Sequence, residues 1–161
     1  MSISAIKFIN SKFLFSLYPN LVIVEKPTTN IDINQLIEII KYGYIEDIIN
    51  ILRSSISKEE YNLIKKDSIP CVTLSGVFTH RDSKNLVNHS GLIQVDIDKV
   101  EDYEATFSKL CKDNYIYVCF RSPGGNGIKA IVKINPSIET HKSQFKALEI
   151  YFKSKVRHCD R

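Results

Sequence analysis

Apolar residues at helical spacing dominate the chain between residues 30 and 67, and this stretch predicts three short helices. The first covers 33–40, where isoleucine and leucine recur on one helical face, and Gly43 ends it. A second helix is predicted from about residue 44 to residue 53, and a third over 58–66. Their apolar stripes are most simply explained as faces that pack into a core.

Capping residues mark the starts of two of these helices. Asp32 is followed three residues later by Gln35, and Ser57 in the same way by Glu60. In such a capping box each side chain accepts a hydrogen bond from the other residue's backbone, which satisfies N–H groups that a helix start leaves without partners. The sequence therefore predicts helix starts at residues 33 and 58.

The pattern changes to short β-branched and aromatic runs after Pro70. The elements that it predicts are a strand over 71–75, a polar loop over 80–88, a strand over 91–98, a helix over 102–112, a strand over 115–120, a glycine-rich loop over 121–127, a strand over 128–134 and a helix over 138–155.

From Gly91 onward the predicted order is strand, helix, strand, strand, helix. This is the ferredoxin-like or RNA-recognition-motif order, β-α-β-β-α-β, without its last strand. We therefore predict an α+β fold in which a helical subdomain (1–68) precedes a sheet-forming subdomain (69–161). The last strand is expected to lie beyond residue 161, in a longer protein. Residues 21–24, or another molecule, are expected to pair with the sheet edge that this leaves open.

Composition narrows the classes of protein without selecting one. The 161 residues are enough for one domain with a core, and the net charge of +4 permits a polyanionic partner without requiring one. No apolar run approaches the roughly 18 residues of a membrane span, so we expect a cytoplasmic protein. The four cysteines contain no C-x-x-C pair, which argues against a zinc ribbon and a disulfide framework.

The strand over 91–98 ends in two carboxylates, Asp96 and Asp98. Residues two apart in a strand project to the same side, so both carboxylates are expected together, with Cα atoms roughly 6.5–7 Å apart. Neighbouring carboxylates repel unless a cation lies between them, and Mg²⁺ or Mn²⁺ bound together with substrate phosphates is one such cation. The alternative is a solvent-exposed strand end that binds nothing.

The loop after the next strand is rich in glycine. It reads Ser122-Pro123-Gly124-Gly125-Asn126-Gly127, and Lys129 follows two residues later. Glycines allow backbone N–H groups to turn toward a phosphate, and a lysine adds positive charge beside them. The spacing does not match a Walker A loop. An ordinary glycine-rich hairpin with a surface lysine is the alternative.

The predicted topology relates these two features. In the β-α-β-β order the first and third strands are neighbours in the sheet. Asp96 and Asp98 are therefore expected beside the strand that contains Lys129, next to the glycine loop. A nucleoside triphosphate with its metal ions matches that combination of groups.

Three segments together resemble a known family. Residues 69–81, 89–98 and 122–129 are similar to the amino-terminal domain of virulence-associated protein E-type proteins, within the archaeo-eukaryotic primase (primase-polymerase) superfamily. The resemblance implies that Asp96 and Asp98 bind the metal and that Ser122 to Lys129 contacts the phosphates of the incoming nucleotide. Arg81, in the polar loop before the strand that carries the two aspartates, is a lower-ranked candidate for a phosphate contact; the favoured alternative is a solvated loop arginine. Many relatives have a histidine where this chain has Lys129.

The same resemblance implies a third carboxylate on the last strand, for which Asp160 is the candidate, although residues 156–161 depart from the family's pattern. The implied function is template-dependent nucleotidyl transfer with Mg²⁺ or Mn²⁺, in phage, plasmid or mobile-element replication. Implied partners are nucleoside triphosphates, a DNA template and a helicase or ATPase domain downstream; no membrane is expected. We expect weak or no polymerase activity without residues beyond 161.

Two other functions remain open on the residues alone. A non-catalytic nucleotide- or nucleic-acid-binding module would use exposed aromatic side chains for base stacking, and Tyr115 and Tyr117 are expected on one face of their strand. A metal-dependent nuclease would also use paired carboxylates, but hydrolysis needs no cradle for a triphosphate.

Overall fold

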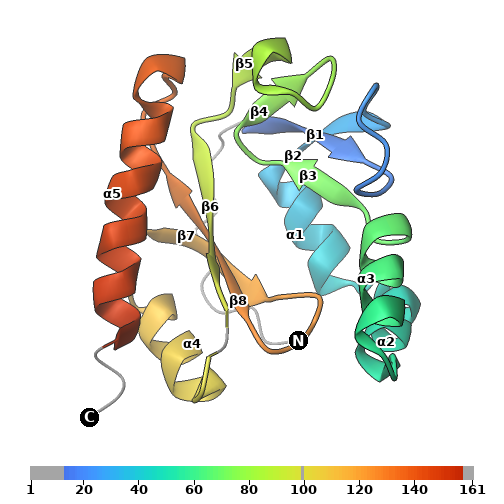
Figure 1. Ribbon diagram of the computed structural model, residues 1–161. Coiled ribbons are helices and arrows are strands. Elements are labelled where there is room, and N and C mark those ends of the chain that lie inside the picture. Colours follow the sequence, from blue (N-terminus) through green and yellow to red (C-terminus); the bar gives the residue numbers. More distant parts are fainter. Residues whose placement is uncertain (1–12, 99, 158–161) are drawn as a thin grey trace. The chain divides into compact units, whose positions relative to one another are not determined.

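The computed structural model describes residues 13–98 and 100–157 (Figure 1). The fold is α+β, as the sequence predicts, with all strand pairs antiparallel among these residues. The chain divides into two compact units. The amino-terminal unit ends at Ser90 and also includes Pro123–Gly125, whereas the carboxy-terminal unit begins at Gly91. The sequence pattern places the boundary between the two subdomains before residue 69, whereas the structure places it between Ser90 and Gly91.

The amino-terminal unit combines two small sheets with three helices. Its elements are β1 (Leu14–Tyr18), β2 (Thr29–Asp32), α1 (Ile33–Lys41), α2 (Glu46–Ser54), α3 (Lys58–Asp67), β3 (Cys71–Thr73), β4 (Gly76–Phe78), a 3₁₀ turn (Ser83–Asn85) and β5 (Leu86–His89). The strands form a sheet of order β2-β1-β3 and a β4-β5 ribbon.

The three predicted helices are confirmed, and so is the first capping box. Asp32 Oδ1 accepts from the backbone of Gln35 at 3.0 Å, and Gln35 Oε1 accepts from the backbone of Asp32 at 3.0 Å. Ser57 Oγ likewise accepts from Glu60 N at 3.0 Å, but the Glu60 carboxylate accepts from Ile56 N. The second box therefore forms only in part.

The strand predicted over residues 21–24 is wrong. These residues form a bend, because the side chain of Asn20 accepts hydrogen bonds from Val22 N at 2.9 Å and Ile23 N at 3.0 Å. An asparagine that binds the following backbone in this way makes a turn and takes the N–H groups away from a strand ladder. The loop predicted over residues 80–88 is also partly wrong, since its last residues begin β5 and pair with β4.

The carboxy-terminal unit has the predicted order of elements. They are β6 (Leu92–Ile97), α4 (Tyr103–Cys111), β7 (Ile116–Arg121), β8 (Ile128–Lys133) and α5 (Ile138–Arg157). The sheet order is β6-β8-β7, so the first and third strands are neighbours, as predicted. Both helices lie on one side of this sheet (Figure 1). A core cluster lies between the two helices and the sheet, and it consists of Ile97, Phe107, Leu110, Cys119, Ile128, Val132 and Phe152.

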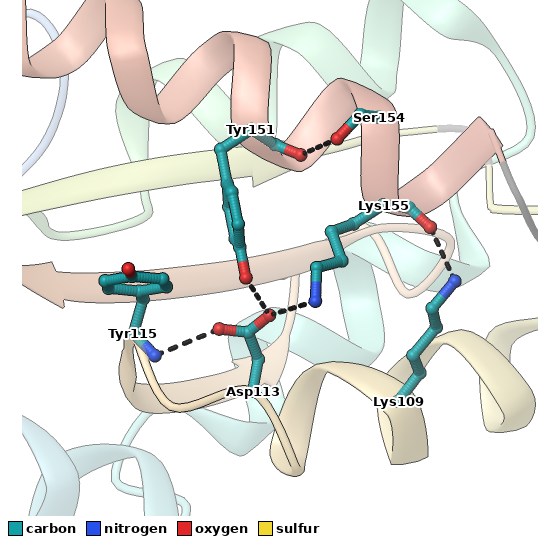
Figure 2. A network of polar contacts seen from close by, with 6 residues as sticks. All are labelled: Lys109, Asp113, Tyr115, Tyr151, Ser154 and Lys155. Atoms are coloured by element: carbon teal, nitrogen blue, oxygen red, sulfur yellow. Dashed lines mark hydrogen bonds and ion pairs between the residues drawn. The ribbon is translucent and has the colours of Figure 1, made fainter.

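A buried aspartate ties α5 to the turn between α4 and β7 (Figure 2). Asp113, whose side chain is 4% exposed, accepts from Tyr151 Oη at 2.8 Å and from Tyr115 N at 2.9 Å. Lys155 Nζ lies 3.3 Å from the same carboxylate. Lys109 Nζ donates to the backbone oxygen of Lys155 at 2.7 Å, which adds a bond from α4.

Candidate functional site

Asp96 lies near the end of β6, directly opposite Lys129 on β8. Because opposed residues of an antiparallel pair project to the same side, their side chains meet: Lys129 Nζ is 2.8 Å from Asp96 Oδ1. Gln94, two residues earlier on the same side of β6, donates to that oxygen at 2.7 Å. Both hydrogen bonds that Asp96 accepts from described residues thus end on Oδ1. Its side chain is 48% exposed.

Asp98 follows β6 and lies against the ends of the glycine loop. Ser122 N donates to Gly127 O at 2.8 Å, and Gly127 N donates to Ser122 Oγ at 3.2 Å, so these two residues close the hairpin. A Cβ atom on Gly127 would lie 3.1 Å from Asp98 Oδ1 and 3.2 Å from Ser122 Oγ. Glycine at this position therefore allows the carboxylate and the serine hydroxyl to approach the same backbone.

Asp96 and Asp98 both line an open pocket of about 470 Å³ between β6 and α5. Val95 and Ile97, which alternate with Asp96, pack against the core, so the Asp96 side chain lies on the other side of β6, and Asp98 follows the end of the strand. The pocket also contains a carboxylate that sequence reasoning missed, Glu149 of α5.

Glu149, whose side chain is 45% exposed, already has a partner of its own. Lys153 Nζ, one helical turn further along α5, lies 2.6 Å from Glu149 Oε1 and holds the pKa of this carboxyl below its ordinary value. No local pattern could have identified Glu149, because it lines this pocket only when α5 folds beside β6.

The remaining residues of the glycine loop divide between the two units. Asn126 is exposed and belongs to the carboxy-terminal unit with Ser122 and Gly127. Gly124 and Gly125 belong to the amino-terminal unit, where Pro123 O accepts from Arg53 Nε at 2.9 Å. Gly125 has φ of 89°, a conformation that side chains rarely adopt.

Arg81 also belongs to the amino-terminal unit, where its guanidinium has close neighbours. It donates to the backbone oxygens of Asn20 and Leu21, and lies 2.8 Å from Cys71 Sγ. Its backbone N–H donates to Val24 O at 2.8 Å. These contacts hold the bend over residues 20–24. Asp160, the predicted third carboxylate, lies outside the described residues.

The chemistry of the site is that of two exposed carboxylates, one lysine and a tight glycine turn. Within 13–98 and 100–157, no group of three or more histidine, cysteine, aspartate or glutamate side chains is arranged to hold a metal ion. Two carboxylates are nevertheless the usual protein contribution to Mg²⁺ when substrate phosphates supply further oxygens. The arrangement is suited to binding a cation together with a phosphorylated ligand.

Fold and site together define an α+β domain with a carboxylate pair beside a glycine turn. Residues 64–161, more than half of the chain, match the family described as BT4734-like, N-terminal domain, and the chain belongs to that family. No curated protein and no solved structure matches the chain. No helix in the described part is long and apolar enough to cross a membrane.

Proposed function

We propose that the chain is a metal-dependent nucleotidyltransferase domain of the primase-polymerase type, acting in replication of a phage, plasmid or mobile element. The observation that supports this most directly is the convergence of Asp96, Asp98, Lys129 and the Ser122–Gly127 turn at one end of the sheet. Its partners would be nucleoside triphosphates, a DNA template and a downstream helicase or ATPase domain.

In this proposal Asp96 and Asp98 hold Mg²⁺ or Mn²⁺. Bound there, two ions would lower the pKa of the attacking 3′-hydroxyl and neutralise charge that develops on the triphosphate. Asp96 Oδ2 accepts no hydrogen bond from described residues and is the oxygen that could bind a cation first. Lys129, now paired with Asp96, would then turn its charge to the phosphates.

The turn closed by Ser122 and Gly127 has a separate task. Backbone N–H groups of such a turn can donate to phosphate oxygens, and glycine leaves them accessible. A Cβ atom on Gly127 would lie only 3.1 Å from Asp98 Oδ1, so Asp98 is beside this turn and metal and phosphate would bind side by side.

A second candidate is a non-catalytic nucleotide- or nucleic-acid-binding module with the same sheet. The exposed ring of Tyr115, 61% accessible, favours it because base stacking needs no metal. Primer extension distinguishes the two, since only the transferase adds nucleotides.

Thermal melts test the proposed site. A ligand that binds only the folded state stabilises it by about 2.7 kcal/mol at 100 times its Kd. We expect millimolar Mg²⁺ or Mn²⁺ with a nucleoside triphosphate to raise the Tm of the parent chain. The same ligands should leave the Tm of Asp96→Asn unchanged. Asp67→Asn, at an exposed aspartate ending α3, is the matched control and should respond like the parent. An unchanged parent Tm would reject the proposal.

A further inference from the structure

The end of the carboxy-terminal sheet opposite Asp96 presents aromatic rings and lysines. Tyr115 precedes β7 and packs edge-to-face on Tyr151 of α5, with ring centroids 5.1 Å apart. Lys133, the last residue of β8, has its Nζ 3.6 Å from the centroid of the Tyr117 ring. Lys155 Nζ lies 5.1 Å from that of Tyr151. We refer to Tyr115, Tyr117, Lys133, Tyr151 and Lys155 as the aromatic end.

The sequence predicts that Tyr115 and Tyr117 share one face of a regular strand, but in the structure they do not. A register shift between Ile116 and Val118 interrupts the alternation of β7 against β8. Tyr115 consequently belongs to the turn after Asp113 and contacts α5, whereas Tyr117 lies beneath the lysine of β8. The exposed Tyr115 consequently lines one pocket together with Lys133 of β8 and Tyr151 of α5.

A pocket of about 630 Å³ opens at the aromatic end. It is lined by Tyr115, Tyr151, Lys133, Asn135, Gln144 and Leu148, among others. Its volume is within the usual range for small-molecule sites, and its walls combine aromatic rings with a cation and amides. These are the groups that contact a nucleobase and its phosphate in single-stranded nucleic-acid complexes.

The charge at the aromatic end is positive. Lys133 is exposed, and Lys155 is 43% exposed. Hydrogen bonds with Tyr151 and Asp113 raise the pKa of Lys155, so it is charged at neutral pH. Asp113 itself is buried and bonded to these same groups (Figure 2), so its carboxylate is shielded from a ligand.

We propose that the aromatic end binds single-stranded nucleic acid, with one base stacked on Tyr115 and the adjacent phosphates against Lys133 and Lys155. Lys133 is four positions beyond Lys129 on β8, about 13 Å along the strand. A strand bound at the aromatic end could therefore continue along the sheet toward Asp96. Its role as a template depends on the proposed function, but its binding does not.

Fluorescence anisotropy with labelled oligothymidylate and oligouridylate of about 12 nucleotides tests this, in EDTA and at low salt. We expect the chain to bind at least one of the two oligonucleotides. The one that binds more tightly identifies DNA or RNA as the preferred strand. Tyr115→Ala should weaken binding about tenfold or more, whereas Tyr115→Phe, which keeps the ring, should bind like the parent. Lys133→Gln should reduce the salt slope of log K by about one.

Tyr44→Ala is the matched control, because Tyr44 is exposed to 69% in the amino-terminal unit, and it should bind like the parent. Unchanged affinity in Tyr115→Ala, absence of binding at low salt, or equally tight binding of inorganic polyphosphate would each overturn the inference. A Tyr115→Ala melting curve confirms that the variant is folded at the assay temperature.

Asp96→Asn separates this inference from the proposed function. It should bind the oligonucleotide like the parent, because Asp96 lies at the other end of the sheet. If the strand binds but metal with triphosphate does not stabilise the chain, only the proposed function fails. If metal with triphosphate stabilises the chain but the oligonucleotide does not bind, only the inference about the aromatic end fails.

Discussion

Two aspartate–lysine ion pairs in the carboxy-terminal unit have opposite surroundings. The side chain of Asp113 is 4% exposed and that of Asp96 is 48% exposed. Asp113 accepts from a backbone N–H, a tyrosine hydroxyl and Lys155, so several elements fix it. Within the described part of the chain, the Asp96 carboxylate accepts only from two side chains, Gln94 and Lys129, which can move.

This difference separates a carboxylate that holds the fold from one that can bind a ligand. A buried acceptor with fixed donors cannot change partners without leaving those donors unsatisfied, which costs free energy. An exposed ion pair contributes little to stability, so its lysine can be exchanged for a metal ion at small cost. The two pairs therefore make opposite predictions for the same substitution.

Removing the buried carboxylate should have the largest effect. We expect Asp113→Ala to lower the free energy of unfolding by about 2–3 kcal/mol, because the Tyr151 hydroxyl and the Tyr115 N–H lose their acceptor. Asp96→Ala should change it by less than about 1 kcal/mol. Urea denaturation of both variants measures the difference, and equal effects would contradict the contrast between the two pairs.

Lowering the pH should remove part of the stability that the Asp113 carboxylate contributes. Burial alone would raise the pKa of Asp113, but hydrogen bonds from Tyr115, Tyr151 and Lys155 hold it below its ordinary value. A carboxyl with a lowered folded-state pKa stabilises the fold above its unfolded pKa of about 3.9, and this contribution disappears as pH falls through the folded-state pKa.

The stability gap between the parent and Asp113→Asn should consequently be constant near neutral pH and shrink below about pH 4. Urea midpoints measured across this range test it. A gap that stays constant down to acid pH would mean that the ionised form of Asp113 has no special stabilisation.

The sequence predicted the carboxy-terminal unit better than the amino-terminal one for a physical reason. Its strands, such as β6 and β8, are six residues long and rich in β-branched side chains, so periodicity alone identifies them. The amino-terminal strands have three to five residues and mix polar with apolar positions. Ser16, for example, is fully buried in β1 because Asn30 and Phe78 satisfy its hydroxyl, which no local pattern reveals.

The candidate site was predictable only where it depends on strand geometry. The predicted topology was enough to place Asp96 opposite Lys129, and both aspartates line the pocket beside β6. The presence of Glu149 in that pocket depends on how α5 packs, and the contacts of Arg81 depend on a bend fixed by Asn20. Both are tertiary contacts between segments far apart in the sequence.

The central claim, that the exposed carboxylates rather than the buried one bind a metal ion, is tested most directly by titrating Mn²⁺ in the presence of a non-hydrolysable nucleoside triphosphate. Electron paramagnetic resonance measures the free ion. The account predicts that Asp96→Asn and Asp98→Asn each weaken Mn²⁺ binding about tenfold or more, whereas folded Asp113→Asn binds it like the parent. Parent-like binding by Asp96→Asn and Asp98→Asn would contradict it.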